Sequence, residues 1–319
     1  MAEILVLSQR DVEELLTMED AIKAMEEVFT ASSKGQAESV GVIQIDASKY
    51  GGGWAAKPGY LLDKGYVGVK LGCYYPGNTK SDLPTHLASI LLSDAHNGMP
   101  LAVLDGLYIT TMRTGATGGA AAKHLARRDS KVVGVLGTGT QGRIQLMALK
   151  NLFDLKEARA YSPDKGRRTA YARDMTKEMG IPVKAVDSAE AAVRGADIII
   201  AATPSKVPVV KDAWIGEGVH INGIGADGLG KKELETKTYK RSKLVTDKVS
   251  VALSKDLFER SDIYAELGEV ISGKKKGRES ADELTVFDST GIGIQDVATA
   301  AIVYQRANKA GKGKRVKFF

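Results

Sequence analysis

Cysteine is almost absent from this chain of 319 residues. Cys73 is the one cysteine, so no disulfide can form within the chain, and this usage suits a reducing compartment. It stands in Val-Gly-Val-Lys-Leu-Gly-Cys-Tyr, a run that is typical of a β-strand. We interpret Cys73 as a small apolar side chain in that strand rather than as a catalytic thiol.

Long apolar runs are missing as well. No stretch approaches the roughly 20 apolar residues that are needed to cross a bilayer. The opening Met-Ala-Glu-Ile-Leu-Val-Leu lacks the basic start and the sustained apolar segment of a signal peptide. Apolar residues nevertheless make up 43% of the chain, which is enough to bury a full core. We therefore expect a cytoplasmic protein with no membrane partner.

Histidine is scarce and scattered. His86, His96, His124 and His220 stand singly, and with the lone cysteine they show no metal-ligand spacing. Structural and catalytic metal sites usually draw several such ligands at short, recurring separations. The sequence therefore predicts no metal.

Basic residues outnumber acidic ones, 45 to 39, which gives a formal net charge of +6. Acids are interleaved with the bases, and basic clusters occur only at 274–276 and in the tail at 312–317. We interpret both clusters as solvated side chains on a loop and at a terminus, and we expect no nucleic-acid partner. The charge balance suits an anionic small molecule equally well.

The beginning of the chain predicts helices. Ser8 with Asp11, and Thr17 with Asp20, place an acid three residues beyond a hydroxyl, the arrangement that satisfies free amide groups at a helix start. Apolar residues then recur at helical spacing. Helices are therefore expected over roughly 9–34.

The next two segments differ in character. Short β-rich runs, 42–45, 67–73 and 88–92, are broken by glycine-rich turns such as 51–53, so the region 40–104 is predicted to be mostly sheet. The segment 110–122 is full of glycine, alanine and threonine. It predicts a helix that packs very closely against a neighbour or a ligand, at a junction between domains.

From residue 131 onward, apolar runs alternate with helical segments. Such alternation predicts an α/β fold with a parallel sheet and helices on both of its faces. The expected strands are 132–136, 158–161, 183–186, 198–202, 219–224, 244–246 and 286–288.

A glycine motif follows the first of these strands. Gly137, Gly139 and Gly142 form a GxGxxG directly after 132–136, and an amphipathic helix opens at Ile144. In this context Gly137 allows a tight turn, Gly139 lets the backbone approach a pyrophosphate, and Gly142 lets helix and strand pack closely. The sequence therefore predicts a Rossmann domain that binds a dinucleotide.

The end of the second strand bears on the choice between NAD and NADP. The position where NAD enzymes keep an acid for the ribose hydroxyls is Ser162, which does not repel a 2′-phosphate. Lys165, Arg167 or Arg168 supplies a positive partner for that phosphate, although Asp164 lies nearby and the arginines also fit the exposed first turn of a helix. We favour NADP over NAD.

Four further segments, together with the glycine loop, resemble the ornithine cyclodeaminase and mu-crystallin family. The resemblance covers essentially the whole chain and is closest to the archaeal alanine dehydrogenase and imine reductase branch. The segments are Gly-Val-Lys at 68–70 with Tyr-Pro-Gly-Asn at 75–78, Thr-Thr-Met-Arg-Thr-Gly-Ala at 110–116, Ile-Gly-Ala-Asp-Gly-Leu-Gly-Lys at 224–231 and Phe-Asp-Ser-Thr-Gly at 287–291.

The resemblance implies a set of site residues and a homodimer. Lys70 would hold the substrate carboxylate, Thr290 would touch the substrate, Arg113 would lie between cofactor and substrate, and Asp227 would be the acid–base group. It also implies a substrate and dimerisation domain at 1–115 with 295–319, and a Rossmann domain at 116–294. The cofactor would contact Thr85, Arg113, Gly137, Gly139, Thr140, Gln141, Gly142, Thr203, Ile224, Gly225, Ala226, Lys231 and Ser289.

The chemistry of imine reduction agrees with two of these roles. Hydride adds rapidly to a C=N carbon only when the nitrogen is protonated, and a carboxylate such as Asp227 can stabilise and relay that proton. The substrate carboxylate needs a fixed cation, and Lys70 projects from a β-rich segment. The structural alternatives are a turn-forming aspartate in Gly-Ala-Asp-Gly and a surface strand lysine.

The chain departs from the cyclodeaminase pattern in two places. No basic residue occurs in 40–45, and the acid that orients the second amino group of ornithine is missing from 55–58, where Lys57 stands instead. A lysine facing an amino-acid pocket suits an acidic side chain, so Lys57 is a candidate substrate-binding residue for an iminosuccinate-like compound.

The sequence therefore predicts an NAD(P)H-dependent imine reductase or amino-acid dehydrogenase. It would transfer hydride between nicotinamide and the α-carbon of a small 2-imino acid or L-amino acid. The alternatives are an ornithine cyclodeaminase and, from another class, a non-enzymatic NADPH-linked binding protein like mu-crystallin. Retention of Asp227, Lys70 and Arg113 argues against the last of these.

Overall fold

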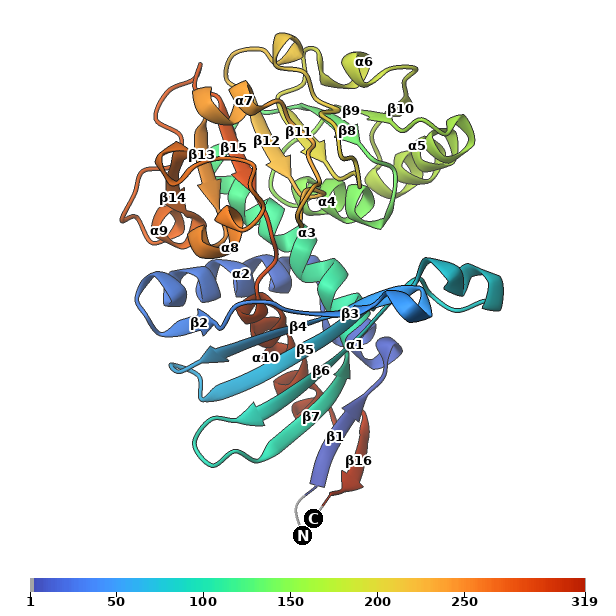
Figure 1. The fold of residues 1–319 in the computed structure, drawn as a ribbon, viewed down its shortest axis with the longest axis vertical. Coiled ribbons are helices and arrows are strands. Elements are labelled where there is room, and N and C mark those ends of the chain that lie inside the picture. The colour runs from blue at the N-terminus through green and yellow to red at the C-terminus, as the bar shows by residue number, and fades with distance from the viewer. Residues whose placement is uncertain (1–2, 319) are drawn as a thin grey trace. The chain divides into compact units, whose positions relative to one another are not determined.

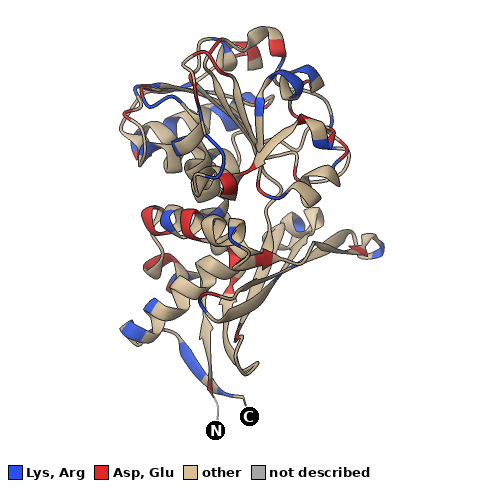
Figure 2. Ribbon diagram, turned by 90° about the vertical axis from the view of Figure 1, so that its left-hand side faces the viewer, with Lys and Arg blue, Asp and Glu red and all other residues tan. Residues whose placement is uncertain are grey.

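The computed structural model describes residues 3–318. The chain divides into two compact units, each with its own eight-stranded sheet. Unit 1 comprises Met1–Arg113 and Ile292–Phe319, and unit 2 comprises Thr114–Gly291. Basic and acidic residues are interleaved along the chain in both units (Figure 2).

Unit 1 begins with β1 (Glu3–Leu7) and two helices, α1 (Gln9–Leu15) and α2 (Met18–Ser33). Ser8 and Thr17 each form a capping box with the acid three residues further on, which confirms the predicted helix starts. Ala21, Met25 and Val28 lie buried on one side of α2, as their spacing requires.

The sheet of unit 1 has the strand order β16-β1-β7-β6-β5-β4-β2, and β3 pairs with β4. Its pairs are antiparallel except for β1 with β7. The predicted sheet region is confirmed, although the glycine turn is shorter than expected. Of the three glycines only Gly51, with φ 79°, lies in the turn, whereas Gly52 and Gly53 already pair in β4. The strands are β2 (Ala37–Ser39), β3 (Ile43–Ala47), β4 (Gly52–Leu61), β5 (Tyr66–Tyr74), β6 (His86–Asp94), β7 (Pro100–Asp105) and β16 (Lys314–Lys317), with 3-10 turns η1 (Ser48–Tyr50) and η2 (Pro76–Ser81).

One face of this sheet is covered by α10 (Gly293–Ala310), which packs on β4 and β5 (Figure 1). The helix approaches very closely at Gly59, where an added Cβ would lie 2.7 Å from the backbone nitrogen of Ile294. The close approach places the first turn of α10 directly on the strands, and Asp296 belongs to that turn. The basic tail, expected as a solvated terminus, is exposed but forms the edge strand β16.

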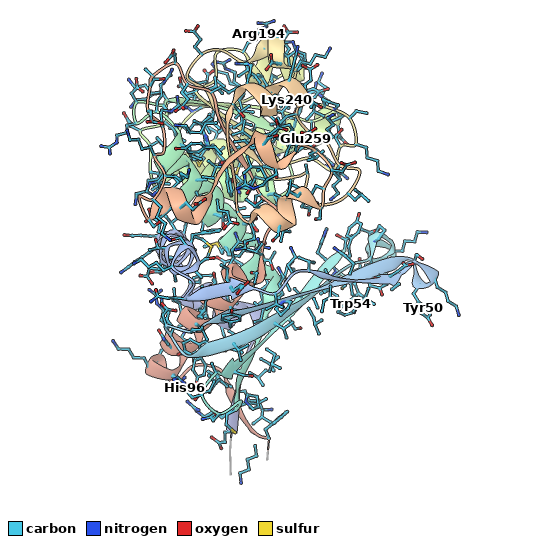
Figure 3. All side chains as sticks on the ribbon, turned by 60° about the vertical axis from the view of Figure 1, so that its left-hand side comes forward. Tyr50, Trp54, His96, Arg194, Lys240 and Glu259 are labelled. Carbon is cyan, nitrogen blue, oxygen red and sulfur yellow. The ribbon has the colours of Figure 1, made fainter. Side chains whose placement is uncertain are left out.

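The opposite face of the same sheet keeps large apolar side chains exposed. Leu71, Leu87 and Leu91 are each about two-fifths exposed, and they alternate with the residues that face α10. Trp54 and Tyr50 extend this exposure along the β3–β4 hairpin, where Figure 3 labels them.

Helix α3 (Gly106–Leu125) runs continuously across the boundary at Arg113 and Thr114. Its glycines allow the close packing that the sequence predicts. A Cβ on Gly115 would lie 2.9 Å from the carbonyl oxygen of Ile144, and one on Gly118 would collide with the amide of Gln145. Helix α3 therefore packs closely against α4 (Thr140–Lys150) within unit 2.

Unit 2 contains a fully parallel sheet with the order β10-β9-β8-β11-β12-β15-β13-β14, which confirms the predicted fold class. Ile198 and Ile200 pack in one apolar cluster and Ile199 in another, so both faces of the sheet are covered. The strands are β8 (Val132–Leu136), β9 (Glu157–Tyr161), β10 (Val183–Ala185), β11 (Ile198–Ala201), β12 (His220–Gly223), β13 (Lys243–Thr246), β14 (Ile263–Glu266) and β15 (Thr285–Asp288). The remaining helices are α5 (Lys165–Met179), α6 (Ala189–Val193), α7 (Thr236–Arg241), α8 (Val249–Leu253) and α9 (Leu267–Ile271), with 3-10 turns η3 (Asp212–Trp214) and η4 (Arg260–Asp262).

The strand order places a topological switch at β8. The chain proceeds outward from β8 to β9 and β10, and then returns to add β11 and β12 on the other side. Ligands of open parallel sheets bind beyond the carboxyl ends of the strands at such a switch. The loops that follow β9, β8, β11, β12 and β15 all leave this edge of the sheet.

Candidate functional site

The glycine loop of unit 2 has the geometry of a phosphate-binding turn. Gly137 has φ 97°, which favours glycine, and its backbone nitrogen donates to the carbonyl of Tyr161 at 2.9 Å. A Cβ on Gly142 would collide with the carbonyl oxygen of Gly137 and would lie 3.4 Å from Val135. The loop is therefore held tightly between β8 and α4, as the motif predicts.

The same loop fits the pyrophosphate of a dinucleotide. A Cβ on Gly139 would meet nothing within 4 Å, so the space beside this backbone is open. Helix α4 begins at Thr140, directly after Gly139, and its first-turn amides are oriented to bind an anion. The buried Oε1 of Gln141 has no hydrogen-bond partner within the described protein. Thr140 and Gln141 thus remain residues that could hold the cofactor.

Ser162 lies beside the glycine loop, after β9. Its hydroxyl accepts a hydrogen bond from Thr138 Oγ1 at 3.0 Å. The guanidinium of Arg168 is already engaged within the protein, because it pairs with Asp187 at 2.7 Å and donates to the carbonyl of Ser162. The side chain of Arg167 is 82% exposed and pairs with the exposed Asp164 at 3.8 Å. Of these two arginines, Arg167 is the better placed to reach a 2′-phosphate.

The loops after β11 and β12 are joined by a residue that the sequence analysis missed. Glu233 is buried, and its carboxylate accepts from the backbone and hydroxyl of Thr203 and from the backbone of Gly225. Ile224 and Ala226 are buried on either side of Gly225. Glu233 stands in Lys-Lys-Glu-Leu, where an acid among lysines looks like an exposed side chain, so no local signal marked it.

The loop after β15 is held by a second missed acid, Asp247. Its buried carboxylate accepts from the backbone of Thr290 at 2.7 Å, from the backbone of Gly291 at 2.6 Å and from the hydroxyl of Thr290 at 2.5 Å. The hydroxyl of Ser289 donates to it at 3.4 Å. One carboxylate therefore fixes the neighbouring residues Ser289 and Thr290, both of which are predicted site residues.

Asp227 follows the loop of β12 and is exposed. Its carboxylate pairs with Lys231 at 2.6 Å, and the two side chains are 55% and 36% exposed, respectively. The buried backbone of Ala226 immediately precedes it. The carboxylate of Asp227 is accessible to a bound molecule. The backbone that carries it belongs to a loop that is anchored by the buried Ala226 and by the hydrogen bond from Gly225 to Glu233.

The predicted substrate residues of unit 1 meet around one buried carboxylate. Lys70 lies in the middle of β5, opposite Lys57 of β4, and its Nζ contacts Asp296 and the hydroxyl of Thr110 at 3.0 and 3.1 Å. Arg113 donates from Nε to Asp296 at 3.0 Å. Lys70, Arg113 and Asp296 are at most 6% exposed at their side chains.

Charge at this cluster favours an additional anion. Burial lowers the pKa of Lys70 from its ordinary 10.5 to about 7, with Asp296 opposing the shift and Arg113 and Lys57 adding to it. Burial alone would raise the pKa of Asp296, but Arg113, Lys70 and Lys57 hold it below its ordinary value. Asp296 was not anticipated, because an acid in the first turn of a helix is usually read as favourable to the helix end.

Thr85 is not part of the Lys70 cluster. It precedes β6, where its hydroxyl lies 3.3 Å from Nδ1 of His86. His86 pairs with Tyr74, four residues along β5 from Lys70, which corresponds to about 13 Å of strand. The role of Thr85 at the cofactor remains a prediction that rests on the resemblance alone.

Residues 3–318 contain neither a metal-binding cluster of side chains nor a membrane-spanning helix. No three histidine, cysteine, aspartate or glutamate side chains in this range are grouped as a metal ion would require. None of the helices formed by these residues is long and apolar enough to span a bilayer.

Comparison with known proteins agrees with this architecture. Residues 2–311 match the ornithine cyclodeaminase/mu-crystallin family. The chain is 42% identical over 326 residues to an alanine dehydrogenase of Archaeoglobus fulgidus, covering 99% of each chain.

The chain belongs to the ornithine cyclodeaminase/mu-crystallin family.

Solved structures of similar proteins share the whole fold. A dimeric archaeal alanine dehydrogenase with bound NAD superposes with a TM-score of 0.93 at 42% identity, with 100% of both chains covered. Thermococcus litoralis Δ1-pyrroline-2-carboxylate reductase, in complex with NADH and L-proline, gives 0.92 at 39% identity, covering 98% of this chain and 100% of the other. Iminosuccinate reductase of Paracoccus denitrificans with NAD+ gives 0.93 at 28% identity, covering 99% and 100%. The resemblance noted in the sequence is thus confirmed.

Proposed function

We propose that this protein is an NAD(P)H-dependent oxidoreductase that reduces a small 2-imino acid, or oxidises the corresponding L-amino acid. The observation that carries the proposal is the buried cluster in which Lys70 and Arg113 both contact Asp296. The same chain has a glycine loop that fits the pyrophosphate of a dinucleotide. Similar proteins that act on alanine, pyrroline-2-carboxylate and iminosuccinate share this fold. A 2-imino acid offers both the carboxylate that the cations require and the C=N bond that a reductase requires.

Four residues of the chain have separate roles in the proposed reaction. Bound nicotinamide supplies the hydride. Lys70 and Arg113 hold the substrate carboxylate by charge-assisted hydrogen bonds, and Thr290 contacts the substrate. Asp227 keeps the imine nitrogen protonated in reduction, and in the oxidative direction it activates the water that attacks the iminium carbon. The reaction releases a keto acid and ammonia in that direction.

Lys57 favours an acidic substrate side chain. It lies directly across the strand pair from Lys70 and adds its positive charge to the same cluster. A second carboxylate, as in iminosuccinate, would be attracted by it. Wild-type enzyme should then reduce iminosuccinate faster than iminopyruvate or a cyclic imine, and Lys57→Met should remove the difference. Equal rates on all three substrates would leave Lys57 without this role.

The cofactor is NADP in preference to NAD. Ser162 would offer a hydroxyl rather than a carboxylate to the adenosine ribose. Arg167 is exposed, and a 2′-phosphate would draw it from its 3.8 Å pair with Asp164. The similar structures contain NAD or NADH, so the chain is expected to accept both. The ratio of kcat/KM for NADPH and NADH measures the preference.

The protein acts as a homodimer through unit 1. The sheet face opposite α10 exposes Leu71, Leu87 and Leu91, and a second copy would bury these apolar side chains. A dimer is seen in the similar archaeal alanine dehydrogenase. Light scattering should give twice the chain mass of 34.0 kDa, and Leu91→Glu should reduce it.

A substrate panel tests the proposed activity. Purified protein is offered 2-oxo acids with ammonia or methylamine, with NADH and NADPH in separate series, and loss of reduced cofactor is followed by its absorbance. Consumption of cofactor that depends on both acid and amine supports a reductase. Conversion of ornithine to proline without net absorbance change would show a cyclodeaminase instead, and cofactor binding without turnover would show a binding protein.

A further inference from the structure

Glu233 joins two loops that leave the same edge of the parallel sheet. Its Oε1 accepts from the backbone nitrogen of Thr203 at 2.5 Å and from the Thr203 hydroxyl at 2.8 Å. Its Oε2 accepts from the backbone nitrogen of Gly225 at 2.7 Å. Thr203 follows β11 and Gly225 follows β12, so one carboxylate spans the ends of two neighbouring strands.

The backbone of Glu233 strengthens the same junction. Its carbonyl oxygen accepts from Val209 and Val210 at 2.8 and 3.0 Å, which ties in the continuation of the loop that starts at Thr203. A Cβ on Gly225 would lie 2.5 Å from the backbone nitrogen of Thr203 and 2.7 Å from Oε1 of Glu233. The three residues therefore pack without space between them.

Burying the carboxylate of Glu233 costs free energy, and the hydrogen bonds that it accepts offset this cost. Glu233 is fully buried, and burial raises its pKa to about 7, against the hydrogen bonds from Thr203, Gly225 and Ala226 that favour its charged form. An unsatisfied buried charge would be strongly unfavourable. Each hydrogen bond to an ionised group contributes about 1.5–3 kcal/mol, so these amide donors keep the charged side chain in place.

We propose that Glu233 is a positioning residue for the cofactor. It fixes the loops of Thr203 and Gly225 before the dinucleotide arrives, so that the cofactor meets a preformed surface beyond its pyrophosphate. It also fixes the segment that leads into Asp227, two residues after Gly225. This inference rests on the proposed nicotinamide-dependent function, and it assigns Glu233 no contact with cofactor or substrate.

Glu233→Gln is the sharpest test because it keeps the size of the side chain. Glutamine has one oxygen and one NH2 group, so in either orientation a donor faces the N–H of Thr203 or of Gly225. One of the two loops must then be released. We expect the Kd for NADH to rise at least about tenfold, the effect of losing one such bond, and amide exchange at Thr203 or Gly225 to accelerate.

Asp197→Asn is the matched control. Asp197 precedes β11, at the other end of the strand, and accepts from the backbone nitrogens of Lys131 and Val132 at 2.8 and 2.9 Å. The same isosteric change should lower the melting temperature but leave the Kd for NADH unchanged. NADH fluorescence without substrate measures the Kd, so the readout does not depend on turnover.

Three outcomes would overturn the inference. The Kd of Glu233→Gln could equal that of wild type, Asp197→Asn could raise the Kd as much, or wild type could fail to bind NADH, in which case the proposed function fails too. If Glu233→Gln does not fold, Thr203→Val removes the hydroxyl donor to Oε1 and leaves the carboxylate. Faster exchange at Gly225 together with a raised Kd then supports the inference. A raised Kd with unchanged exchange at Gly225 would be the effect of Thr203 alone, and it would overturn the inference, as would no change in either.

Discussion

Both units contain a lysine paired with a buried aspartate, and the two pairs differ in their surroundings. Lys70 pairs with Asp296 in unit 1, and Lys255 pairs with Asp288 in unit 2. In both pairs the aspartate side chain is 0% exposed, and the two lysine side chains are 6% and 2% exposed. Judged by burial and pairing alone, the two would be equally strong site candidates.

The neighbouring charges separate them. Arg113 adds a second cation beside Asp296, whose pKa lies below its ordinary value. Burial raises the pKa of Asp288 to about 6, Lys255 opposes this shift and Asp247 adds a second negative charge. The unit 1 pair thus has surplus positive charge, which suits an anionic substrate, whereas the unit 2 pair has surplus negative charge. Surplus charge is therefore more informative than the presence of a buried ion pair.

The largest effect is expected for Asp227, which we propose transfers the proton in place of either buried aspartate. Asp227→Asn should lower kcat about 10²–10⁴-fold, because the amide cannot exchange a proton with the imine nitrogen. The Kd for NADH should not change. Steady-state kinetics and fluorescence titration measure the two quantities.

Asp174→Asn is the control for that variant, since Asp174 also forms a partly exposed ion pair in unit 2, with Arg143 at 3.1 Å. It should keep wild-type turnover. If Asp227→Asn were as active as the control, the acid–base group would have to lie elsewhere, and the two buried aspartates would become the next candidates.

The second prediction compares the two pairs directly. Asp296→Asn and Asp288→Asn should each lower the free energy of unfolding by about 3–5 kcal/mol, because each leaves a lysine buried without its counter-ion. Urea unfolding measures both. A large loss in one variant and none in the other would mean that the pairs are not equivalent supports of their units.

The pH dependence of substrate binding should distinguish the Lys70–Asp296 pair from the Lys255–Asp288 pair. The proposed role of Lys70, to hold the substrate carboxylate, requires its charged form. Affinity for a 2-oxo acid should therefore be full well below pH 7 and fall about tenfold per pH unit well above that value. Without Asp296 the charged form of Lys70 loses support, so Asp296→Asn should move the fall to lower pH. Lys70→Arg should abolish it, because arginine stays protonated.

Asp288→Asn is the matched control for the pH profile and should leave it unchanged. Binding is measured without ammonia, so the titration of ammonia does not contribute. A wild-type profile that is flat from pH 6 to 9 would mean that Lys70 does not hold the substrate carboxylate.

The smallest effect concerns the cofactor loop of unit 2. Arg167→Ala should raise the KM for NADPH about tenfold, the loss of one charge-assisted contact at an exposed site, with little change for NADH. Arg173→Ala, an exposed arginine on the same helix, should change neither. Equal losses with both cofactors would place the 2′-phosphate away from Arg167.

The comparison also explains how much the sequence could predict. In unit 2 the strands, the glycine loop and Ser162 were predictable, because each is encoded in consecutive residues whose local conformation follows from their types. Glu233 and Asp247 were not, because they act through hydrogen bonds to loops far along the chain, and a carboxylate in a charged or turn-like segment looks like any exposed acid.

Unit 1 was predictable to a smaller extent. Its helix starts follow from short capping patterns, but the Lys70 cluster is assembled from β5, α3 and α10, segments that are far apart in the sequence. The resemblance to the family supplied Lys70 and Arg113. Asp296 required the fold, since the contact between α10 and the sheet decides which side of that helix is buried.

The binding of NADH and of a 2-oxo acid to Lys70→Met shows whether Lys70 holds the substrate carboxylate. Fluorescence titration with NADH, followed by titration of the NADH complex with a 2-oxo acid, measures both affinities in one variant. We expect an unchanged Kd for NADH and a loss of at least about tenfold in affinity for the acid, because methionine fills the space of the lysine without its charge. Unchanged affinity for the acid, or an equal loss for both ligands, would contradict it.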